Sequence, residues 1–344
     1  MNQSKSAPPI EIVVTGGNTD DRLAAIDAIC RALDPYLDVA VSYDLVAPEF
    51  RDDDIFTQLQ KERSRREDFQ RTIQTASPEA SVIIYEHGIC DTAVGVSRTD
   101  FLVALHHQEM SLFEARDSYA AVVIVESPEN ETTELAWLGH PHLFVASAEI
   151  SKEERLETIA RHVVGLDGHL EIERKFLLRE IPDVQSPPLD RAPYFDILQT
   201  YLVSNDPKVE RRLRMRRGEN ETMYFLTEKR DVGSGVREEH ETTISQREYK
   251  RLLRDSDPHL HEISKRRYCF LWQGRQIELD VYVSPPSLAV AEVELEAMTD
   301  KWLLPPTLNV AREVTDDPAY RNSNLARQTI INPSLEPDSI VAGL

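Results

Sequence analysis

The sequence contains only three cysteines, Cys30, Cys90 and Cys269, and no two of them form a CxxC pair. Disulfide-rich scaffolds and thiolate zinc sites need more cysteines at closer spacing. We therefore expect neither kind of site. Few, widely spaced thiols are typical of proteins in a reducing cytoplasm.

The chain is also short of positive charge, because 39 Lys and Arg face 60 Asp and Glu, which gives a net charge of -21. A general nucleic-acid-binding protein needs a surplus of Lys and Arg to hold the phosphate backbone. The composition therefore argues against a nucleic-acid partner. Any anionic ligand has to be bound by a local group of basic side chains.

Long hydrophobic runs are missing as well. The segment MNQSKSAPPIEIVV has a polar lead and then an apolar run of strand length. Such a run is too short for a signal peptide or a membrane span. We expect a cytoplasmic protein with no membrane partner.

The length of 344 residues exceeds the usual size of one hydrophobic core, so we expect two domains. The first begins with the strand EIVVT, the loop GGNTDD and an amphipathic run from Arg22 to Leu33. Apolar strands at 81–85 and 120–125 alternate with helical segments at 54–75 and 99–115. This alternation is typical of a parallel sheet covered by helices.

The boundary between the domains is predicted from a helix and its end. Ser151 and Glu154 form a capping box for a helix that runs to about Val164. The GLDG that follows is typical of a helix end and a linker, near Asp167. We therefore predict domains at 9–166 and 168–344.

Beyond this boundary, charged residues recur at every second position in short segments, a period that places them on one face of a strand. For a single strand, the simplest interpretation is the solvated face of an ordinary antiparallel sheet. The segments are Glu171, Glu173 and Lys175; Arg212, Arg214 and Arg216; Arg237, Glu239 and Glu241; Lys265 and Arg267; Glu278 and Asp280; and Glu292, Glu294 and Glu296.

The whole set favours a barrel with charge inside and helices outside. The opposite faces of some segments are apolar, as in Ile277, Leu279 and Val281, and need a cover of their own. A closed barrel of about eight strands can enclose one small ligand. Buried like charges are costly unless they are compensated, so acidic clusters call for divalent cations and basic clusters call for a polyanion. Together they indicate a triphosphate bound with Mg²⁺ or Mn²⁺.

At these residues the chain resembles the CYTH family of triphosphate tunnel enzymes, whose antiparallel barrel begins with an ExExK strand. Here that strand is HLEIERKFLL. The resemblance extends over residues 168–344 through an ordered series of segments. They are QTYL at 199–202, ERRLRMR at 210–216, TEK at 227–229, REEHE at 237–241, KRR at 265–267, ELD at 278–280, EVELE at 292–296 and REVTDDPAYRNSNLA at 312–326.

The resemblance implies roles for the matching positions. The implied metal ligands are Glu171, Glu173, Asp280, Glu292 and Glu294. The implied triphosphate-binding residues are Lys175, Arg212, Arg214, Lys229, Lys265, Arg267 and Arg312, the last closing one end of the tunnel. Glu239 and Glu241 would bind a second metal ion or orient the attacking water. With Glu171, Glu173 and Lys175, they form the implied catalytic set. A rim or surface position explains Arg216, Glu278 and Glu296 equally well.

The N-terminal half resembles the kinase-like NTPase domain that is sometimes fused to CYTH domains. The resemblance depends on IVVTGGNTDDRLAAI, EHGICD at 86–91 and WLGHPHL at 137–143. A working P-loop needs GxxxxGK[ST], but Asp21, Arg22 and Leu23 stand at the last three positions. Asp21 places a carboxylate where phosphate should lie, and Leu23 removes the metal-binding hydroxyl. We therefore predict a degenerate P-loop domain that does not hydrolyse ATP and serves stability, contacts or regulation.

The predicted fold class is α+β overall, with an α/β parallel-sheet domain followed by an antiparallel eight-stranded tunnel barrel with flanking helices. The leading function is hydrolysis of a small triphosphate, in which water attacks the terminal phosphorus. Tripolyphosphate, thiamine triphosphate and nucleoside triphosphates all remain open as substrates. The alternatives are an adenylate cyclase of the same fold and a non-catalytic triphosphate or polyphosphate binding module.

Overall fold

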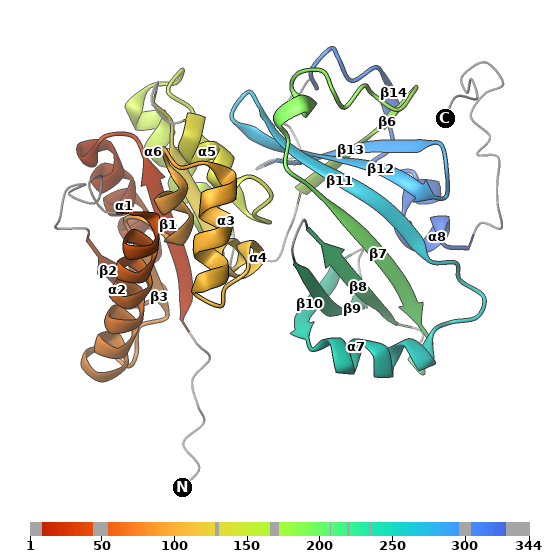
Figure 1. Ribbon diagram of the computed structural model, residues 1–344, viewed down its shortest axis with the longest axis horizontal. Coiled ribbons are helices and arrows are strands. Elements are labelled where there is room, and N and C mark those ends of the chain that lie inside the picture. Colours follow the sequence, from red (N-terminus) through yellow and green to blue (C-terminus); the bar gives the residue numbers. More distant parts are fainter. Residues whose placement is uncertain are drawn as a thin grey trace, which may run out of the picture. The chain divides into compact units, whose positions relative to one another are not determined.

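The computed structural model describes residues 9–43, 54–127, 131–165, 172–206, 208–218, 221–233, 236–295 and 304–327. The chain forms two compact units (Figure 1). The first comprises Met1–Gly168 with Gln273–Arg275, and the second comprises His169–Trp272 with Gln276–Leu344. The boundary predicted near Asp167 lies outside the described residues and stays a prediction.

A parallel sheet with the order β5-β4-β1-β3-β2 forms the centre of the first unit. Its strands are β1 (Ile10–Gly16), β2 (Val39–Ser42), β3 (Val82–Tyr85), β4 (Ala121–Val125) and β5 (Leu143–Ala146). Strands β3, β4 and β5 are buried along their whole length. Continuous burial is expected where helices cover both faces of a parallel sheet. The parallel sheet predicted from the sequence is confirmed in this respect.

Helices surround this sheet (Figure 1), and α1 packs against α6 while α2 packs against α3 and η2. They are α1 (Thr19–Leu33), α2 (Ile55–Ala76), η2 (Ile89–Ala93), α3 (Arg98–His107), α4 (Leu112–Asp117), α5 (Glu131–Trp137) and α6 (Lys152–Gly165). Side-chain caps begin most of them, and Asn18 caps α1 by accepting from the Asp21 N–H.

The single helix predicted at 99–115 is wrong, because two helices occupy this segment. Helix α3 ends at His107, and Glu109 has a φ of 53° that a right-handed helix cannot contain. A new helix then begins at the capping box of Ser111 and Glu114. Apolar residues are buried in both helices, at Phe101, Ala104 and Leu105 in α3 and at Phe113 and Ala115 in α4, so the break was marked only by the cap residues.

In the described part of the second unit, nine strands form an antiparallel sheet in the order β10-β9-β8-β7-β11-β12-β13-β6-β14. They are β6 (Ile172–Leu178), β7 (Tyr194–Leu202), β8 (Val209–Arg217), β9 (Thr222–Gly233), β10 (Val236–Ile244), β11 (Ile263–Trp272), β12 (Arg275–Ser284), β13 (Leu288–Leu295) and β14 (Val310–Glu313). The short helices are η4 (Leu189–Arg191), α7 (Gln246–Leu252), η5 (Leu253–Asp255), η6 (Pro318–Tyr320) and α8 (Asn322–Leu325).

The predicted closed barrel of eight strands differs from this order. Within the described residues, β10 pairs only with β9 and β14 pairs only with β6, so the order has two ends. The sheet is nevertheless curved, and Figure 1 shows β12 and β13 facing β8 and β9 across the second unit. The mixed α+β class with a large antiparallel sheet is confirmed.

The outer face of this sheet is apolar and covered. One core cluster contains Phe176, Ile277, Leu279, Ala291 and Val293, which alternate along β6, β12 and β13 with the charged positions. A second cluster places Leu213 of β8 against Tyr249 and Leu252 of α7. Burial of these side chains fixes the register, because a slip by one residue would turn the charged set outward.

None of the described helices has the length and apolar character needed to cross a membrane.

Gly88 lies where two buried side chains of the first unit approach the backbone. A Cβ atom at this position would lie 2.8 Å from Val13 Cγ2 and 2.9 Å from two ring carbons of Trp137. Val13 and Trp137 are both fully buried, so neither can move aside easily.

We therefore predict that Gly88→Ala destabilises the first unit by about 1–3 kcal/mol, the usual cost of overpacking. Urea unfolding followed by tryptophan fluorescence measures the change. An unfolding curve that superimposes on that of the wild type would show that this contact is not tight.

Candidate active site

The register of the antiparallel sheet collects the alternating charged positions on one face. Residues directly opposite each other in an antiparallel pair share a face. Lys175 of β6 is opposite Glu292 of β13, and Glu173 is opposite Glu294. Glu292 is in turn opposite Glu278 of β12. Three neighbouring strands therefore present their charges together.

The same face continues through the other strands. Opposed pairs on it are Lys265 and Ile197, Arg267 and Phe195, Gln199 and Arg214, Tyr201 and Arg212, Ile197 and Arg216, Arg212 and Thr227, Thr227 and Glu241, and Lys229 and Glu239. We call this surface the inner face. It carries every described position that the sequence assigned to the site on β6 and β8–β13.

One end of the inner face is apolar. A buried cluster closes it with Leu177, Tyr201, Ile263, Tyr282 and Val290, together with Val314, Leu325 and Ala326 from the C-terminal segment. Tyr282 Oη also donates a hydrogen bond of 2.8 Å to Asn322 Oδ1 of α8. The charged middle of the face is therefore bounded on one side by a packed apolar wall.

Lys175 lies between two carboxylates. Its Nζ donates to Glu292 Oε1 at 2.6 Å and lies 2.9 Å from Glu173 Oε2. Glu292 is buried, whereas the Glu173 side chain is 39% exposed. The ammonium group neutralises both acids and holds them on one side of the face.

The two carboxylates have opposite pKa shifts. Burial, and then the nearby charge of Glu292, raises the pKa of Glu173 to about 8. The cations Lys175 and Arg267 overcome the effect of burial at Glu292 and hold its pKa well below the usual range. Glu173 is thus the acid of this pair for which a further positive charge would be most stabilising.

Asp280 and Arg267 form the centre of the inner face. Arg267 Nε donates to Asp280 Oδ1 and Arg267 Nη2 donates to Asp280 Oδ2, both at 2.7 Å. Lys265 Nζ also donates to Asp280 Oδ2, and Arg267 Nη1 donates to Glu278. Arg267 Nη2 reaches Glu292 Oε2 at 2.8 Å and so joins this centre to the Lys175 group.

A second polar group lies on β8–β10. Arg214 Nη1 is 3.2 Å from Glu241 Oε2, and Thr227 Oγ1 donates to the same oxygen at 2.7 Å. Arg212 is buried beside Tyr201, whose pKa burial raises to about 12 even though Arg212 acts in the opposite direction. Strand β8 therefore adds the guanidinium groups of Arg212 and Arg214 to that of Arg267 on the inner face.

Some predicted site residues are not brought into these contacts. Glu171 lies outside the described residues, and the structure describes the backbone register of Glu239 but not its side chain. Glu294 is exposed. Arg312 is about half exposed, donates to Asp317 Oδ2 at 2.7 Å and lies over Tyr320. The roles of all predicted site residues stay predictions.

Sequence reasoning missed or misplaced several inner-face residues. Gln199 and Thr227 are almost completely buried there, although neither is charged. Arg216 is buried with its guanidinium carbon 4.1 Å from the centre of the Phe195 ring, so the rim interpretation is wrong for this residue. Glu278 contacts Arg267 instead of lying apart from it. The period of two already contained Arg216 and Glu278, and extending it to uncharged side chains would have added Gln199 and Thr227.

The described residues contain no group of three or more His, Cys, Asp or Glu side chains arranged to hold a metal ion. The donor chemistry nevertheless fits a hard cation, because Glu173, Glu292 and Glu294 are carboxylates on adjacent strands. The raised pKa of Glu173 is also the response expected of an acid that would be stabilised by a cation.

The CYTH domain family matches residues 169–317. This part of the chain therefore belongs to that family, and the predicted resemblance is confirmed there. The match does not extend into the first unit, so the P-loop resemblance stays a prediction.

Solved structures give weaker comparisons. An inorganic triphosphatase is 29% identical, with 46% of this chain and 96% of that chain covered and a TM-score of 0.35. A second structure, described as a hypothetical protein, is 31% identical, with 46% and 99% covered and a TM-score of 0.35. A Hippeastrum protein described as an adenylyl cyclase candidate with a dominant triphosphatase activity is 17% identical, with 37% and 80% covered and a TM-score of 0.28. Scores this low carry no structural argument. No curated protein sequence matched the chain.

In the first unit, the guanidinium group of Arg22, a residue of α1, binds the loop between β1 and α1. Arg22 Nη1 donates to the carbonyl oxygens of Gly16 and Gly17, both at 2.9 Å, and Arg22 Nη2 is 3.1 Å from Glu86 Oε1. Phosphate-binding loops instead direct backbone N–H groups toward an anion. Asp21 lies in the first turn of α1, where it accepts from Asn18 and lies 3.4 Å from Lys152 Nζ.

The segments 86–91 and 137–143, on which the NTPase resemblance of the first unit depends, are joined by hydrogen bonds to Asp91. Its Oδ1 accepts from Trp137 Nε1 at 3.0 Å and from Thr15 Oγ1 at 2.8 Å, and its Oδ2 accepts from the Gly88 N–H at 2.7 Å. Asp91 therefore links three segments of the fold through hydrogen bonds, which is a structural role.

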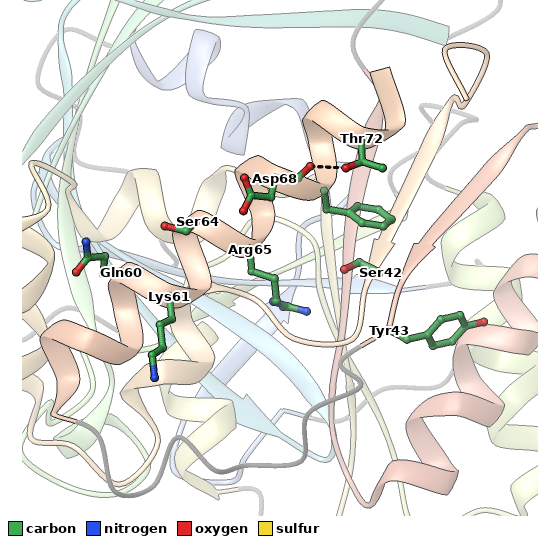
Figure 2. A pocket seen from close by; sticks show the side chains of 9 residues that line it. Ser42, Tyr43, Gln60, Lys61, Ser64, Arg65, Asp68 and Thr72 are labelled. Carbon is green, nitrogen blue, oxygen red and sulfur yellow. Dashed lines mark hydrogen bonds between the residues drawn. The ribbon is translucent and has the colours of Figure 1, made fainter. Parts of the chain in front are cut away.

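An open pocket of about 670 Å³ lies in the first unit, at the end of β2 and along α2, and Figure 2 shows side chains that line it. Ser42 and Tyr43 come from the end of β2, and Lys61, Arg65 and Asp68 come from α2. None of the residues that line it belongs to the predicted site. The cavity is therefore separate from the inner face of the second unit.

Arg216 and Arg217 offer a matched test of the two faces of β8. Arg216 is buried over the Phe195 ring, whereas Arg217 is 58% exposed and pairs with Asp196 at 3.0 Å. A desolvated cation–π contact is worth about 2 kcal/mol, and an exposed ion pair about 0–1 kcal/mol.

We predict that Arg216→Ala lowers the free energy of unfolding by about 1–2 kcal/mol more than Arg217→Ala does. Chemical unfolding of the two variants side by side measures the difference. Equal losses would contradict the assignment of Arg216 to the buried inner face.

Proposed function

We propose that the second unit is a metal-dependent triphosphatase that hydrolyses the terminal phosphoanhydride of a small triphosphate. One observation carries the proposal: the sheet register places carboxylates and cations together on a single inner face, with Lys175 between Glu173 and Glu292. A surface that binds only an anion would not carry carboxylates, because they repel the anion. A surface that binds only a metal ion would not carry buried Lys and Arg side chains, because they repel the ion.

Mg²⁺ or Mn²⁺ would be held by Glu173, Asp280, Glu292 and Glu294, with Glu171 from outside the described residues. When bound, such an ion supplies a positive charge beside the phosphate oxygens. The structure supports these ligands through the register of β6 and β13 and through the raised pKa of Glu173. The choice between the two metals stays open.

The cations of the inner face would bind and orient the phosphate chain. Arg267 and Lys265 are held rigidly by Asp280, while Arg212 and Arg214 approach from β8. Guanidinium groups can neutralise the non-bridging oxygens on which negative charge develops in phosphoryl transfer. Glu241, held by Thr227 and Arg214, would orient the attacking water.

A small triphosphate is favoured as substrate. The net charge of -21 does not favour a long anionic polymer such as an RNA end. The CYTH match over residues 169–317 supports a triphosphate substrate, and tripolyphosphate is the simplest one to test first. Thiamine triphosphate and nucleoside triphosphates remain candidates, and the cytoplasmic location stays a prediction.

The products distinguish this proposal from its alternatives. A triphosphatase releases orthophosphate from tripolyphosphate, ATP or thiamine triphosphate with Mg²⁺ or Mn²⁺. An adenylate cyclase converts ATP into cyclic AMP and pyrophosphate. A binding module binds the triphosphate without releasing any product.

Glu173→Gln tests the central carboxylate. We predict that this variant stays folded, because Glu173 is partly exposed, and that its phosphate release from tripolyphosphate falls at least about 100-fold. Initial rates of orthophosphate release measure the effect. Activity within about tenfold of the wild type, a barrier change of roughly 1.4 kcal/mol, would rule out the proposed role.

Glu228→Gln is the matched control. Glu228 lies on the outer face of β9, is 44% exposed and pairs with Arg211 at 2.8 Å. Loss of this carboxylate also removes one charge from the second unit, but not from the inner face. Its activity should stay close to that of the wild type.

For the first unit, we propose a degenerate NTPase-like domain without catalytic turnover. The support is the Arg22 guanidinium, which is bound by the loop carbonyls of Gly16 and Gly17 and by Glu86. A nucleotide phosphate would have to displace this internal pairing. Asp21 and Leu23 also lack the chemistry of the glycine and the metal-binding hydroxyl of a working loop.

We predict that the full chain carrying Glu173→Gln, whose inner face is silenced, shows no Mg²⁺-dependent hydrolysis of ATP or GTP. The same assay should stay negative after the loop is restored by Asp21→Gly, Arg22→Lys and Leu23→Thr, because Glu86 is unchanged. Sustained turnover of ATP or GTP by a Glu173→Gln protein that has lost its activity on tripolyphosphate would show that the first unit is an active NTPase.

A further inference from the structure

The open pocket of the first unit, which we call the α2 pocket, lies at the carboxyl end of β2. Ser42 ends this strand and Tyr43 follows it, while Lys61, Arg65 and Phe69 come from successive turns of α2. Residues four positions apart share one face of a helix. Open parallel sheets bind their ligands at the carboxyl ends of the strands. The volume of about 670 Å³ is also usual for a small-molecule site.

The Arg65 side chain is held in place at this pocket. Its Nε donates to Glu62 Oε2 at 3.1 Å and its Nη2 donates to Glu62 Oε1 at 2.7 Å. Nη2 also donates to the carbonyl oxygen of His87 at 3.3 Å. The Glu62 side chain is 8% exposed, whereas that of Arg65 is 23% exposed. The planar fork is therefore fixed on one side, and its accessible part lines the pocket.

Ser42 lies near this guanidinium group. Its carbonyl oxygen accepts from the Glu86 N–H at 3.2 Å, next to the His87 carbonyl that binds Arg65. Figure 2 shows the Arg65 side chain extending from α2 toward the end of β2, where Ser42 lies. A hydroxyl group and a guanidinium group can both donate to the oxygens of an anion.

The charges around the pocket favour an anion. Lys61 adds a positive charge to the lining one helical turn before Arg65. In a chain with a net charge of -21, a local group of cations is what an anionic ligand needs. Three nearby acids are paired with cations of this chain, in the pairs Glu62 and Arg65, Asp68 and Arg71, and Glu86 and Arg22.

The loop between β1 and α1 differs from this pocket, although it also lies at the carboxyl end of the sheet. Arg22 donates to the carbonyl oxygens of Gly16 and Gly17 there, both at 2.9 Å. A cation of the chain is thus bound where a phosphate-binding loop would bind an anion. The α2 pocket instead directs donors of its own, from Arg65 and Ser42, toward an accessible space.

An aromatic ring forms the apolar side of the α2 pocket. The Phe69 ring lines it and lies edge to face with Tyr85, with 6.0 Å between the ring centres. Tyr85 is buried, so it supports Phe69 from within the unit. Tyr43, which is half exposed, adds a second ring to the lining. Aromatic rings beside a fixed guanidinium group suit a ligand with a flat apolar part next to its anionic group.

We propose that the α2 pocket is a binding site for a small organic phosphate that carries a flat apolar group. Arg65, Lys61 and the Ser42 hydroxyl bind the phosphate oxygens, and Phe69 contacts the apolar group. The site binds this ligand without a reaction. It lies in the first unit, so it does not depend on the triphosphatase function of the second.

The position of the ligand is tested with crystals of the full chain soaked in para-bromophenyl phosphate, because bromine gives an anomalous difference peak. We expect a bromine peak beside Phe69, with the phosphate group in contact with Arg65 and Ser42. A bromine peak on the inner face alone, or no peak at the α2 pocket, overturns the proposed site.

Two variants test the cations in solution, by titration calorimetry of the full chain with phenyl phosphate in the presence of EDTA. Lys61→Gln removes one charge, and Arg65→Lys keeps the charge but loses the planar fork. We expect each variant to weaken binding at least about fivefold. Inorganic phosphate, which lacks the ring, should bind the wild type at least about fivefold more weakly than phenyl phosphate does. Equal affinity for the two ligands contradicts the contact with Phe69.

Arg63→Gln is the matched control. Arg63 lies on the same helix, is 41% exposed and pairs with Glu67 at 3.0 Å, but it does not line the pocket. This variant removes the same charge as Lys61→Gln, and its affinity for phenyl phosphate should stay within about twofold of the wild type. An equal loss in Arg63→Gln and Lys61→Gln would show a general effect of charge and overturn the site.

Binding of phenyl phosphate to the inner face is common to the wild type and all three variants, so it cannot cause a difference among them. Four equal affinities would therefore assign the binding to another surface and overturn the proposal. If Arg65→Lys fails to fold by circular dichroism, Lys61→Gln and the bromine position decide, because the Lys61 side chain is exposed.

Discussion

The ion pairs buried on the inner face are the constraint on which the second unit depends. Asp280 and Glu292 are almost inaccessible to water, as is Lys265. Charges in such a position are tolerated only when they are paired with good geometry. Arg267 supplies that geometry because its planar fork binds Asp280 with two nitrogens and reaches Glu292 with one of them. A sheet in any other register would leave these charges unpaired.

The apolar outer face enforces this register from the other side. Ile277, Leu279 and Val293 alternate with Glu278, Asp280 and Glu292, so burial of one set presents the other. The first unit differs, because strands β3, β4 and β5 of its parallel sheet are buried along their whole length and the loop after β1 is bound by a charged side chain. The pairing of Arg22 with Glu86 shows how such a loop can be satisfied without a ligand.

Much of the second unit could be predicted because a period of two is a strong signal when it repeats over many strands. The charged positions of β6, β8 and β11–β13 were found in this way, and the register then brought them to one face. The partners of each charge could not be predicted, since they depend on which strands become neighbours. Asp280 is the clearest case, because its contacts come from β11.

Other features could not be predicted from the sequence, for reasons particular to each position. The break between α3 and α4 lies at Glu109, whose positive φ has no hydrophobic signature. Arg216 resembled a rim residue, because the end of a strand is hard to place from one sequence and its stacking on Phe195 depends on the neighbouring strand. Gln199 and Thr227 carry no charge and so did not enter the alternating pattern, although both are buried on the inner face.

The positions of the bound metal ion and triphosphate test the proposed site most directly. Crystals of the full chain grown with Mn²⁺ and a non-hydrolysable tripolyphosphate analogue would give an anomalous difference map that locates the metal. We predict a manganese peak beside the inner-face carboxylates, Glu173 among them, and phosphate oxygens in contact with Arg267 and Lys265. A manganese ion or an analogue bound away from the inner face would contradict the proposed site.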